Sequence, residues 1–168
     1  MIRKIFYITL LCVLYLGKSY SQNKKSILKT LIGDKVENSI GIMPLGMHTT
    51  GHEHGVDFFG TYYLSYTHNG FEGFVFKNSY RDWTTGIVYK RGWFFTENLY
   101  AQYGLGIAYG YKGRLSKVQG IPLKNTFLFN GDFNLIGGLD VGYKITDKLA
   151  FNTIITPLVF IYGIRYYL

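Results

Sequence analysis

From residue 38 onward, apolar and polar residues alternate along the chain with a period of two, which is the period of a β-strand whose two faces differ. The segment 99–111 is the clearest example, and segments 56–67 and 133–144 repeat it. In 99–111 one face is apolar and aromatic and the other is small or polar: Leu99, Ala101, Tyr103, Leu105, Ile107, Tyr109 and Tyr111 against Tyr100, Gln102, Gly104, Gly106, Ala108 and Gly110. Strands of this length are about twice as long as most strands in globular proteins.

Eight such strands are predicted, and short turn signals such as His68-Asn69-Gly70 separate several of them. A large apolar face combined with a small, polar second face is typical of a membrane barrel that turns the apolar face to lipid. An even strand number suits closure, and eight strands leave no wide pore. We therefore expect an all-β fold, an eight-stranded antiparallel transmembrane β-barrel over residues 38–168. The predicted strands are 39–48, 55–67, 71–79, 83–94, 98–111, 132–144, 148–157 and 159–168.

The N-terminal part of the chain has a different pattern. Arg3 and Lys4, an apolar run over 5–17 and small residues near position 21 predict a secretory signal peptide over residues 1–21. In 22–37 apolar residues return at helical spacing, which predicts a short amphipathic helix lying on a membrane surface. Packing of this helix on a soluble core is the alternative.

Composition narrows the possible functions. The chain's one cysteine lies inside the predicted signal peptide, so disulfide and thiol chemistry are excluded for the mature protein. No nucleic-acid-binding module is recognisable, and we expect no nucleic-acid partner. Basic residues gather in the segment 112–124, which predicts a surface that faces anionic lipid headgroups; ordinary solvated charge is the alternative.

One charged residue is expected inside the barrel. Arg165 lies in the last predicted strand, on the face opposite its large apolar residues. A buried charge without a partner is costly, and Asp140 is the best partner because its strand also places it on the lumen face. We expect this pair to hold the barrel in shape.

Candidate catalytic residues lie at the predicted outer rim. His48 ends the first strand and Asn78-Ser79 ends the third, with one strand between them. A histidine that takes the proton of a serine or substrate hydroxyl makes a nucleophile, and a third group that fixes the imidazole improves it. Strand alternation would point Ser79 and Asn78 to opposite faces unless the strand bends or ends there. A rim histidine and a turn serine without chemistry are the alternative.

Two further patterns concern the same rim. His48, His52, Glu53 and His54 offer imidazole and carboxylate ligands for zinc, but a solvated loop is the better interpretation, and we expect neither a metal nor a cofactor. Proline removes a donor from the strand ladder, so Pro44 and Pro157 predict two places where interstrand hydrogen bonding is weakened. Such a place would serve as a lateral gap for a lipid chain; alternatively, Pro157 only shapes the last loop.

The order of several motifs resembles a known family. The predicted N-terminal helix is followed by "PLGMH", "FKNSYRDW", "YGLGIAYGY" and a C-terminal "GIRYYL". This series is similar to the outer-membrane lipid A palmitoyltransferase (PagP) family and its PagP-like relatives. The resemblance implies a monomeric barrel in the outer membrane of a Gram-negative cell. It also implies an acyltransferase that moves a palmitoyl-like chain from a phospholipid donor to lipid A as acceptor.

By the same resemblance, His48 takes the place of the family's catalytic histidine and Ser79 that of its serine. Asn78 stands where the family has an aspartate. An asparagine accepts a hydrogen bond from an imidazole N–H, but it carries no charge to stabilise an imidazolium. A second interpretation therefore stays open: a non-enzymatic outer-membrane barrel of the same fold, with a lipid-binding, adhesive or structural role.

Overall fold

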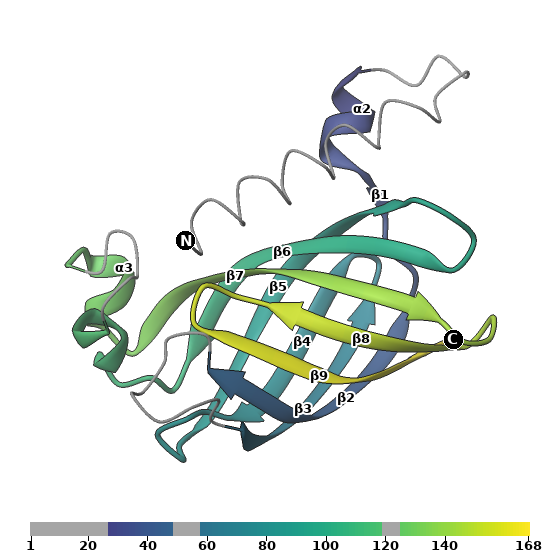
Figure 1. Ribbon diagram of the computed structural model, residues 1–168. Helices are drawn as coiled ribbons and strands as arrows, with labels where there is room; N and C mark the ends of the chain where they lie inside the picture. Colours follow the sequence, from purple (N-terminus) through teal and green to yellow (C-terminus); the bar gives the residue numbers. More distant parts are fainter. Residues whose placement is uncertain (1–26, 49–57, 119–124) are drawn as a thin grey trace, which may run out of the picture. The chain divides into compact units, whose positions relative to one another are not determined.

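The computed structural model describes residues 27–48, 58–118 and 125–168 (Figure 1). The chain forms two units, Met1–Gly33 and Asp34–Leu168. In the first unit α2 spans Ile27–Ile32 and ends at Gly33, whose φ of 82° lies in the left-handed region that glycine favours. The helical segment expected over 22–37 therefore stops before Asp34–Lys35, which form the short strand β1. None of the described helices is long and apolar enough to cross a membrane.

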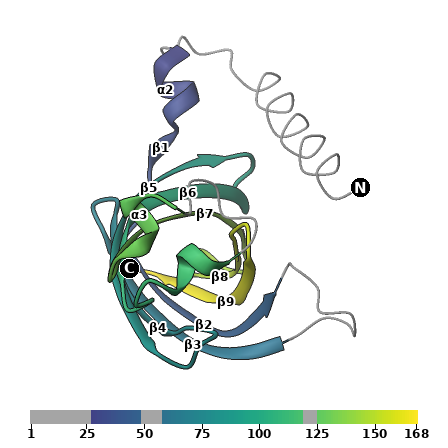
Figure 2. The ribbon, with the colours of Figure 1, turned by 90° about the vertical axis from the view of Figure 1, so that its left-hand side faces the viewer.

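The second unit is a closed antiparallel barrel (Figures 1 and 2). Each strand pairs with the next, and the ring closes because β9 pairs with β2. The expected all-β fold and the eight-stranded antiparallel barrel are thereby confirmed. The barrel strands are β2 (Ser39–His48), β3 (Phe58–His68), β4 (Phe71–Lys77), β5 (Trp83–Phe94), β6 (Leu99–Tyr109), β7 (Phe133–Lys144), β8 (Leu149–Ile155) and β9 (Val159–Tyr167).

The two ends of the barrel differ. At one end, here called the turn end, short hairpins join the strands; in one of them Asn69 and Gly70 have φ angles of 53° and 88°, as a tight two-residue turn requires. At the other, called the loop end, lie the segments 78–82, 110–118, 125–132 and 156–158. The loop end contains the 3₁₀ helix η1 (Arg114–Lys117) and the helix α3 (Phe127–Asn130), on the left of Figure 1.

The strand β1 completes the sheet at the turn end. Asp34 and Lys35 pair with Gly92 and Arg91 of β5. The ladder between β4 and β5 begins at Phe71 and Tyr89, so β1 occupies the edge of β5 that the shorter β4 leaves open.

Side chains alternate between the two faces of the barrel wall, as the sequence predicts. In β3 the inward residues Thr61, Tyr63, Ser65 and Thr67 are buried, whereas Tyr62, Leu64 and Tyr66 are exposed. On the outward face many aliphatic residues lie towards the middle of the strands and many aromatic residues lie near both ends. Its exposed members include Ile42, Leu64, Ile87, Leu105 and Ile107 in the middle, Tyr66, Phe71, Tyr89, Tyr143 and Phe151 near the turn end, and Phe58, Trp83, Tyr109 and Phe133 near the loop end.

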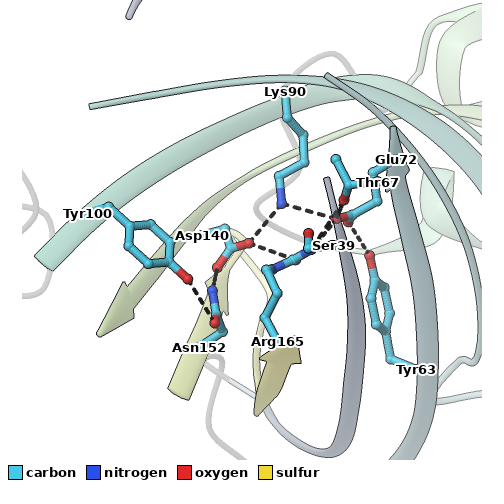
Figure 3. A network of polar contacts seen from close by, with 9 residues as sticks. All are labelled: Ser39, Tyr63, Thr67, Glu72, Lys90, Tyr100, Asp140, Asn152 and Arg165. Atoms are coloured by element: carbon cyan, nitrogen blue, oxygen red, sulfur yellow. Dashed lines mark hydrogen bonds and ion pairs between the residues drawn. The ribbon is translucent and has the colours of Figure 1, made fainter. Parts of the chain in front are cut away.

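The turn-end half of the interior holds four buried charges (Figure 3). The guanidinium of Arg165 lies 2.7 Å from a carboxylate oxygen of Glu72 and 2.9 Å from one of Asp140. The ammonium of Lys90 approaches the same two carboxylates, at 3.2 Å and 2.8 Å. The predicted pair of Arg165 with Asp140 is confirmed, and it is half of a quartet whose formal charges cancel.

Neutral side chains extend this quartet to the remaining strands. Tyr63 and Thr67 each donate to Glu72 at 2.8 Å. Asn152 donates to Asp140 at 2.6 Å and accepts from Tyr100 at 3.0 Å. The network satisfies most lone pairs of its two carboxylates, which is the condition under which a buried ion pair is tolerated. Its nine members, which come from all eight barrel strands, are Ser39, Tyr63, Thr67, Glu72, Lys90, Tyr100, Asp140, Asn152 and Arg165.

We predict that Arg165→Met lowers the free energy of unfolding by about 3–5 kcal/mol, because it leaves two buried carboxylates with one cation. Equilibrium unfolding in urea measures the change. Adding Glu72→Gln to Arg165→Met restores charge balance and should recover part of the loss. Lys148→Met, which removes an exposed cation, is the matched control. Equal midpoints for Arg165→Met and Lys148→Met would contradict a central role for the network.

Candidate functional site

The loop-end half of the barrel encloses a cavity of about 360 Å³. Its floor is the charged network, represented by Glu72, Lys90 and Asp140. The inward positions of the strands change from polar to apolar above this floor: in β4, Glu72 is followed by Phe74 and Phe76. The apolar walls include Phe74, Phe76, Val88, Ile136, Ile154 and Ile161. The cavity therefore suits a chain of methylene groups better than a polar ligand.

Described residues of the loop between β6 and β7 cover the loop end of this cavity. Leu115 in η1 is buried and lines the cavity together with Val118 and Phe129. Figure 2 looks onto the loop end and shows η1, the short green helix near the centre, in front of the ring of strands. The apolar side chains of this loop extend the cavity wall over the end of the barrel.

The ladder of hydrogen bonds is interrupted at Pro44, as expected, and strand β8 ends before Pro157. The pairing of β2 passes over Pro44 on both sides, with register shifts against β3 and β9. Opposite it, Tyr62 has a φ of 49°, and the Thr61 hydroxyl donates to the carbonyl of Met43. These shifts are β-bulges, which accommodate a residue that has no N–H to donate.

The second interruption lies between β7 and β8. The last pair of this ladder is Leu139 with Ile155, so residues 133–138 of β7 have no ladder partner in β8. Pro157 lies in the turn that follows β8, which agrees with the alternative expectation that it shapes the last loop. The cavity is lined on this side by residues of both segments, namely Leu135, Ile136, Gly137, Gly138, Thr156, Pro157 and Leu158. Here the apolar interior approaches the outer face of the barrel.

His48 lines the cavity near the loop end of the barrel. It is the last residue of β2, and its ring stacks on Phe59 with 4.5 Å between the ring centroids. Its Nδ1 is buried and has no hydrogen-bond partner among the described residues. A buried polar atom without a partner costs about 1–3 kcal/mol, so this nitrogen gains from any ligand group that hydrogen-bonds to it.

Ser79 lines the same cavity from the turn between β4 and β5. Strand β4 ends at Lys77, so strand alternation no longer fixes the direction of Ser79. The structure thus brings His48 and Ser79 to one cavity. Among the described contacts, no hydrogen bond joins them directly. A substrate in the cavity would have to lie between them for both to act on it.

Asn78 has a different place. Its side chain is buried, and its Oδ1 accepts from the backbone N–H groups of Tyr80 and Asp82 at 2.9 Å and 3.1 Å. Its amide nitrogen donates to the Thr84 hydroxyl at 3.0 Å and to the carbonyl of Gly110 at 3.5 Å. None of these bonds, among the residues described, reaches His48 or Ser79. In the structure Asn78 holds the turn that presents Ser79.

Other candidate ligands lie partly outside the described residues. His52, Glu53 and His54 belong to the segment 49–57, which the structure does not describe. Within the described ranges no group of three or more histidine, cysteine or carboxylate side chains is arranged to hold a metal ion.

Sequence reasoning missed Glu72 and Lys90, although a signal for both is present. Glu72 follows the outward residue Phe71, and Lys90 follows the outward residue Tyr89, so alternation alone directs both charges into the lumen. Two inward charges of opposite sign on adjacent strands would have indicated the quartet.

No family model matches this chain, and no curated protein matches it.

We predict that Asn78→Asp destabilises the protein by about 1–3 kcal/mol, because a carboxylate cannot donate to Thr84 and the Gly110 carbonyl. Thermal unfolding of the purified protein measures the effect. Asn98→Asp makes the same chemical change at an exposed turn position and is the control. An Asn78→Asp protein as stable as the Asn98→Asp protein would show that the amide donors are dispensable.

Proposed function

We propose that this chain is an outer-membrane β-barrel that takes up a fatty acyl chain of a phospholipid and transfers it to lipid A. The observation that carries the proposal is that His48 and Ser79 both line an apolar cavity whose opposite end is closed by a charged network. Burial of an acyl chain in such a cavity is favourable because each buried methylene contributes about 0.8 kcal/mol.

The outer face of the barrel supports a place in a membrane. Many of its exposed aliphatic residues lie towards the middle of the wall, and many exposed aromatic residues lie near its two ends. Membrane barrels have this arrangement because aromatic rings favour the two interfaces between lipid and water. The longer strands, such as Leu99–Tyr109 with 11 residues, match the length that a tilted membrane strand needs. The signal peptide expected over 1–21 agrees with export.

The lateral interruption beside Pro157 supports entry of the lipid from the side. The loop that carries Leu115 covers the axial opening, whereas residues 133–138 have no strand partner in β8. A phospholipid that passes its acyl chain between β7 and the turn after β8 keeps its headgroup outside the barrel. Pro44 marks a second interruption on the opposite side of β9.

The reaction would be acyl transfer with His48 as general base. The imidazole removes the proton of a lipid A hydroxyl while that oxygen bonds to the ester carbonyl carbon of the donor. The tetrahedral intermediate collapses, the bond to the glycerol oxygen breaks, and the imidazolium returns the proton to this leaving oxygen. The products are acylated lipid A and a lysophospholipid. Ser79 would donate a hydrogen bond to the oxyanion or act as the first acyl acceptor.

A second function is favoured by the contacts of Asn78. Both ends of its amide are engaged in the turn, so it supplies no group that orients or charges the His48 imidazole. A barrel that binds lipid in the same cavity without transferring the acyl chain is therefore the second candidate.

Lipid A mass spectrometry tests the first candidate. We expect the protein, expressed in a Gram-negative host that lacks its own lipid A palmitoyltransferase, to add one acyl chain to lipid A. His48→Ala should remove this activity, and Ser79→Ala should remove or strongly reduce it. His68→Ala, at the exposed turn end, is the control and should leave it unchanged.

If the protein is folded in the outer membrane and lipid A remains unmodified, acyl transfer is rejected. Phospholipid that copurifies with that protein, detected by native mass spectrometry, would then support the second candidate. Absence of both signals would reject both functions.

The cavity length is tested at Gly104, which lines the cavity. A Cβ at this position would make only ordinary contacts, 3.5 Å from the nearest side-chain atoms of Lys90 and Val88. Gly104→Met should therefore fold and should shorten the longest acyl chain that is bound or transferred. Gly73→Met adds the same side chain on the outward face, where nothing lies within 4 Å, and should not change the chain length. Identical acyl profiles for both variants would contradict this placement of the chain.

A further inference from the structure

The charges of the described part of the barrel unit are unevenly distributed. At the turn end four cations balance four carboxylates, and the interior quartet is neutral. The described loop-end residues include five cations but only two carboxylates. The loop-end cations are Lys77, Arg81, Lys112, Arg114 and Lys117, and the carboxylates are Asp82 and Asp132. The excess positive charge of the described barrel therefore lies at the loop end.

Four of these cations, Arg81, Lys112, Arg114 and Lys117, are here called the loop-end basic cluster. Asp82 brings two of them together: one of its oxygens lies 2.9 Å from the Lys112 ammonium and the other 2.8 Å from the Arg114 guanidinium. The hydrogen bond from Lys112 holds the pKa of Asp82 below its usual range, so this carboxylate is charged at neutral pH. One carboxylate thus fixes two cations side by side and leaves positive charge in excess.

The cationic groups remain accessible to a ligand. The side chain of Lys112 is 61% exposed and that of Arg114 is 41% exposed. The Arg114 guanidinium lies over the ring of Tyr80, 5.0 Å from its centroid, which limits its orientations. An arginine held in this way loses less entropy when it binds an anion.

The cluster adjoins the cavity through shared elements. Tyr80, which lies under Arg114, also lines the cavity. In η1, Leu115 is buried in the cavity wall while Arg114 and Lys117 on either side of it remain at the surface. One loop therefore presents an apolar side chain to the interior and cations to the exterior. An amphiphile with an apolar chain next to an anionic head is complementary to this arrangement.

We propose that the loop-end basic cluster binds the phosphate groups of lipid A and so positions this acceptor beside the cavity. The proposal rests on the function proposed above, because that function places lipid A at the loop end. Phosphate oxygens accept charge-assisted hydrogen bonds from Arg114 and Lys112, and the remaining cations add attraction without a fixed geometry. Asp82 holds the two cations side by side in the free protein. It also competes with the phosphate for their N–H donors.

Native mass spectrometry of the full chain in maltoside micelles tests the proposal without requiring transfer. The probes are lipid A with both phosphates, the same lipid A after enzymatic dephosphorylation, and phosphatidylcholine. We expect the bisphosphorylated lipid to bind at least tenfold more tightly than the dephosphorylated one. The double variant Lys112→Gln/Arg114→Gln should remove this preference, and the control Lys35→Gln/Lys148→Gln, which removes two cations at the turn end, should keep it.

Asp82→Asn separates ligand binding from a purely structural role. Both Asp82→Asn and the Lys112→Gln/Arg114→Gln variant break the same ion pairs. If these pairs only hold the loop in place, both changes should shift lipid binding in the same direction. If the cations bind phosphate, Asp82→Asn removes a competing anion and should tighten the bisphosphorylated lipid severalfold, whereas the double variant weakens it.

Several results would overturn the proposal. Equal affinity for bisphosphorylated and dephosphorylated lipid A, or shifts of both variants in the same direction, would do so. Displacement of the lipid by inorganic phosphate at equal concentration would also do so, because the cluster would then be a site for free phosphate. Transfer that is unaffected by the double variant would reject the cluster and leave the proposed activity standing. Phosphate-dependent binding without transfer would support the cluster and reject the proposed activity.

Discussion

Arg165 lies where a charge is most costly, in the interior of a narrow barrel between Glu72 and Asp140. A buried guanidinium is tolerated only if its partners are close and are themselves hydrogen-bonded, and here every barrel strand supplies at least one of the nine residues of the network. A slip of one residue in any strand would turn its member of the network towards the outer face. The network therefore fixes the register of the whole barrel as well as its cross-section.

The same network determines where a ligand can be held. Because charged and polar side chains fill the turn-end half, the interior ends in a floor formed by Glu72, Lys90 and Asp140. The remaining space is apolar, and Leu115 covers it at the loop end, while residues beside the end of the β7–β8 ladder line it on one side. Polar filling of one half thus leaves an apolar compartment in the other.

Most of the fold follows from the alternation along the chain, because alternation reports directly which face of a strand is buried. It predicted all eight barrel strands and the pairing of Arg165 with Asp140. The contacts of Asn78 could not be predicted in this way. They depend on Thr84 and on Gly110, which lies 32 residues away and reaches Asn78 only through the tertiary fold. The cover formed by Leu115 was also beyond the sequence pattern, since a short 3₁₀ helix in a long loop has no clear period.

The two-residue strand β1 has a consequence for how separate copies of the chain meet. The open rim of β5 next to β4 would be a template on which a strand of another molecule could add. Asp34 and Lys35 occupy this template from within the same chain, through pairs with Gly92 and Arg91. This charged dipeptide therefore leaves no unpaired edge of β5 at this position to which a strand of another molecule could add.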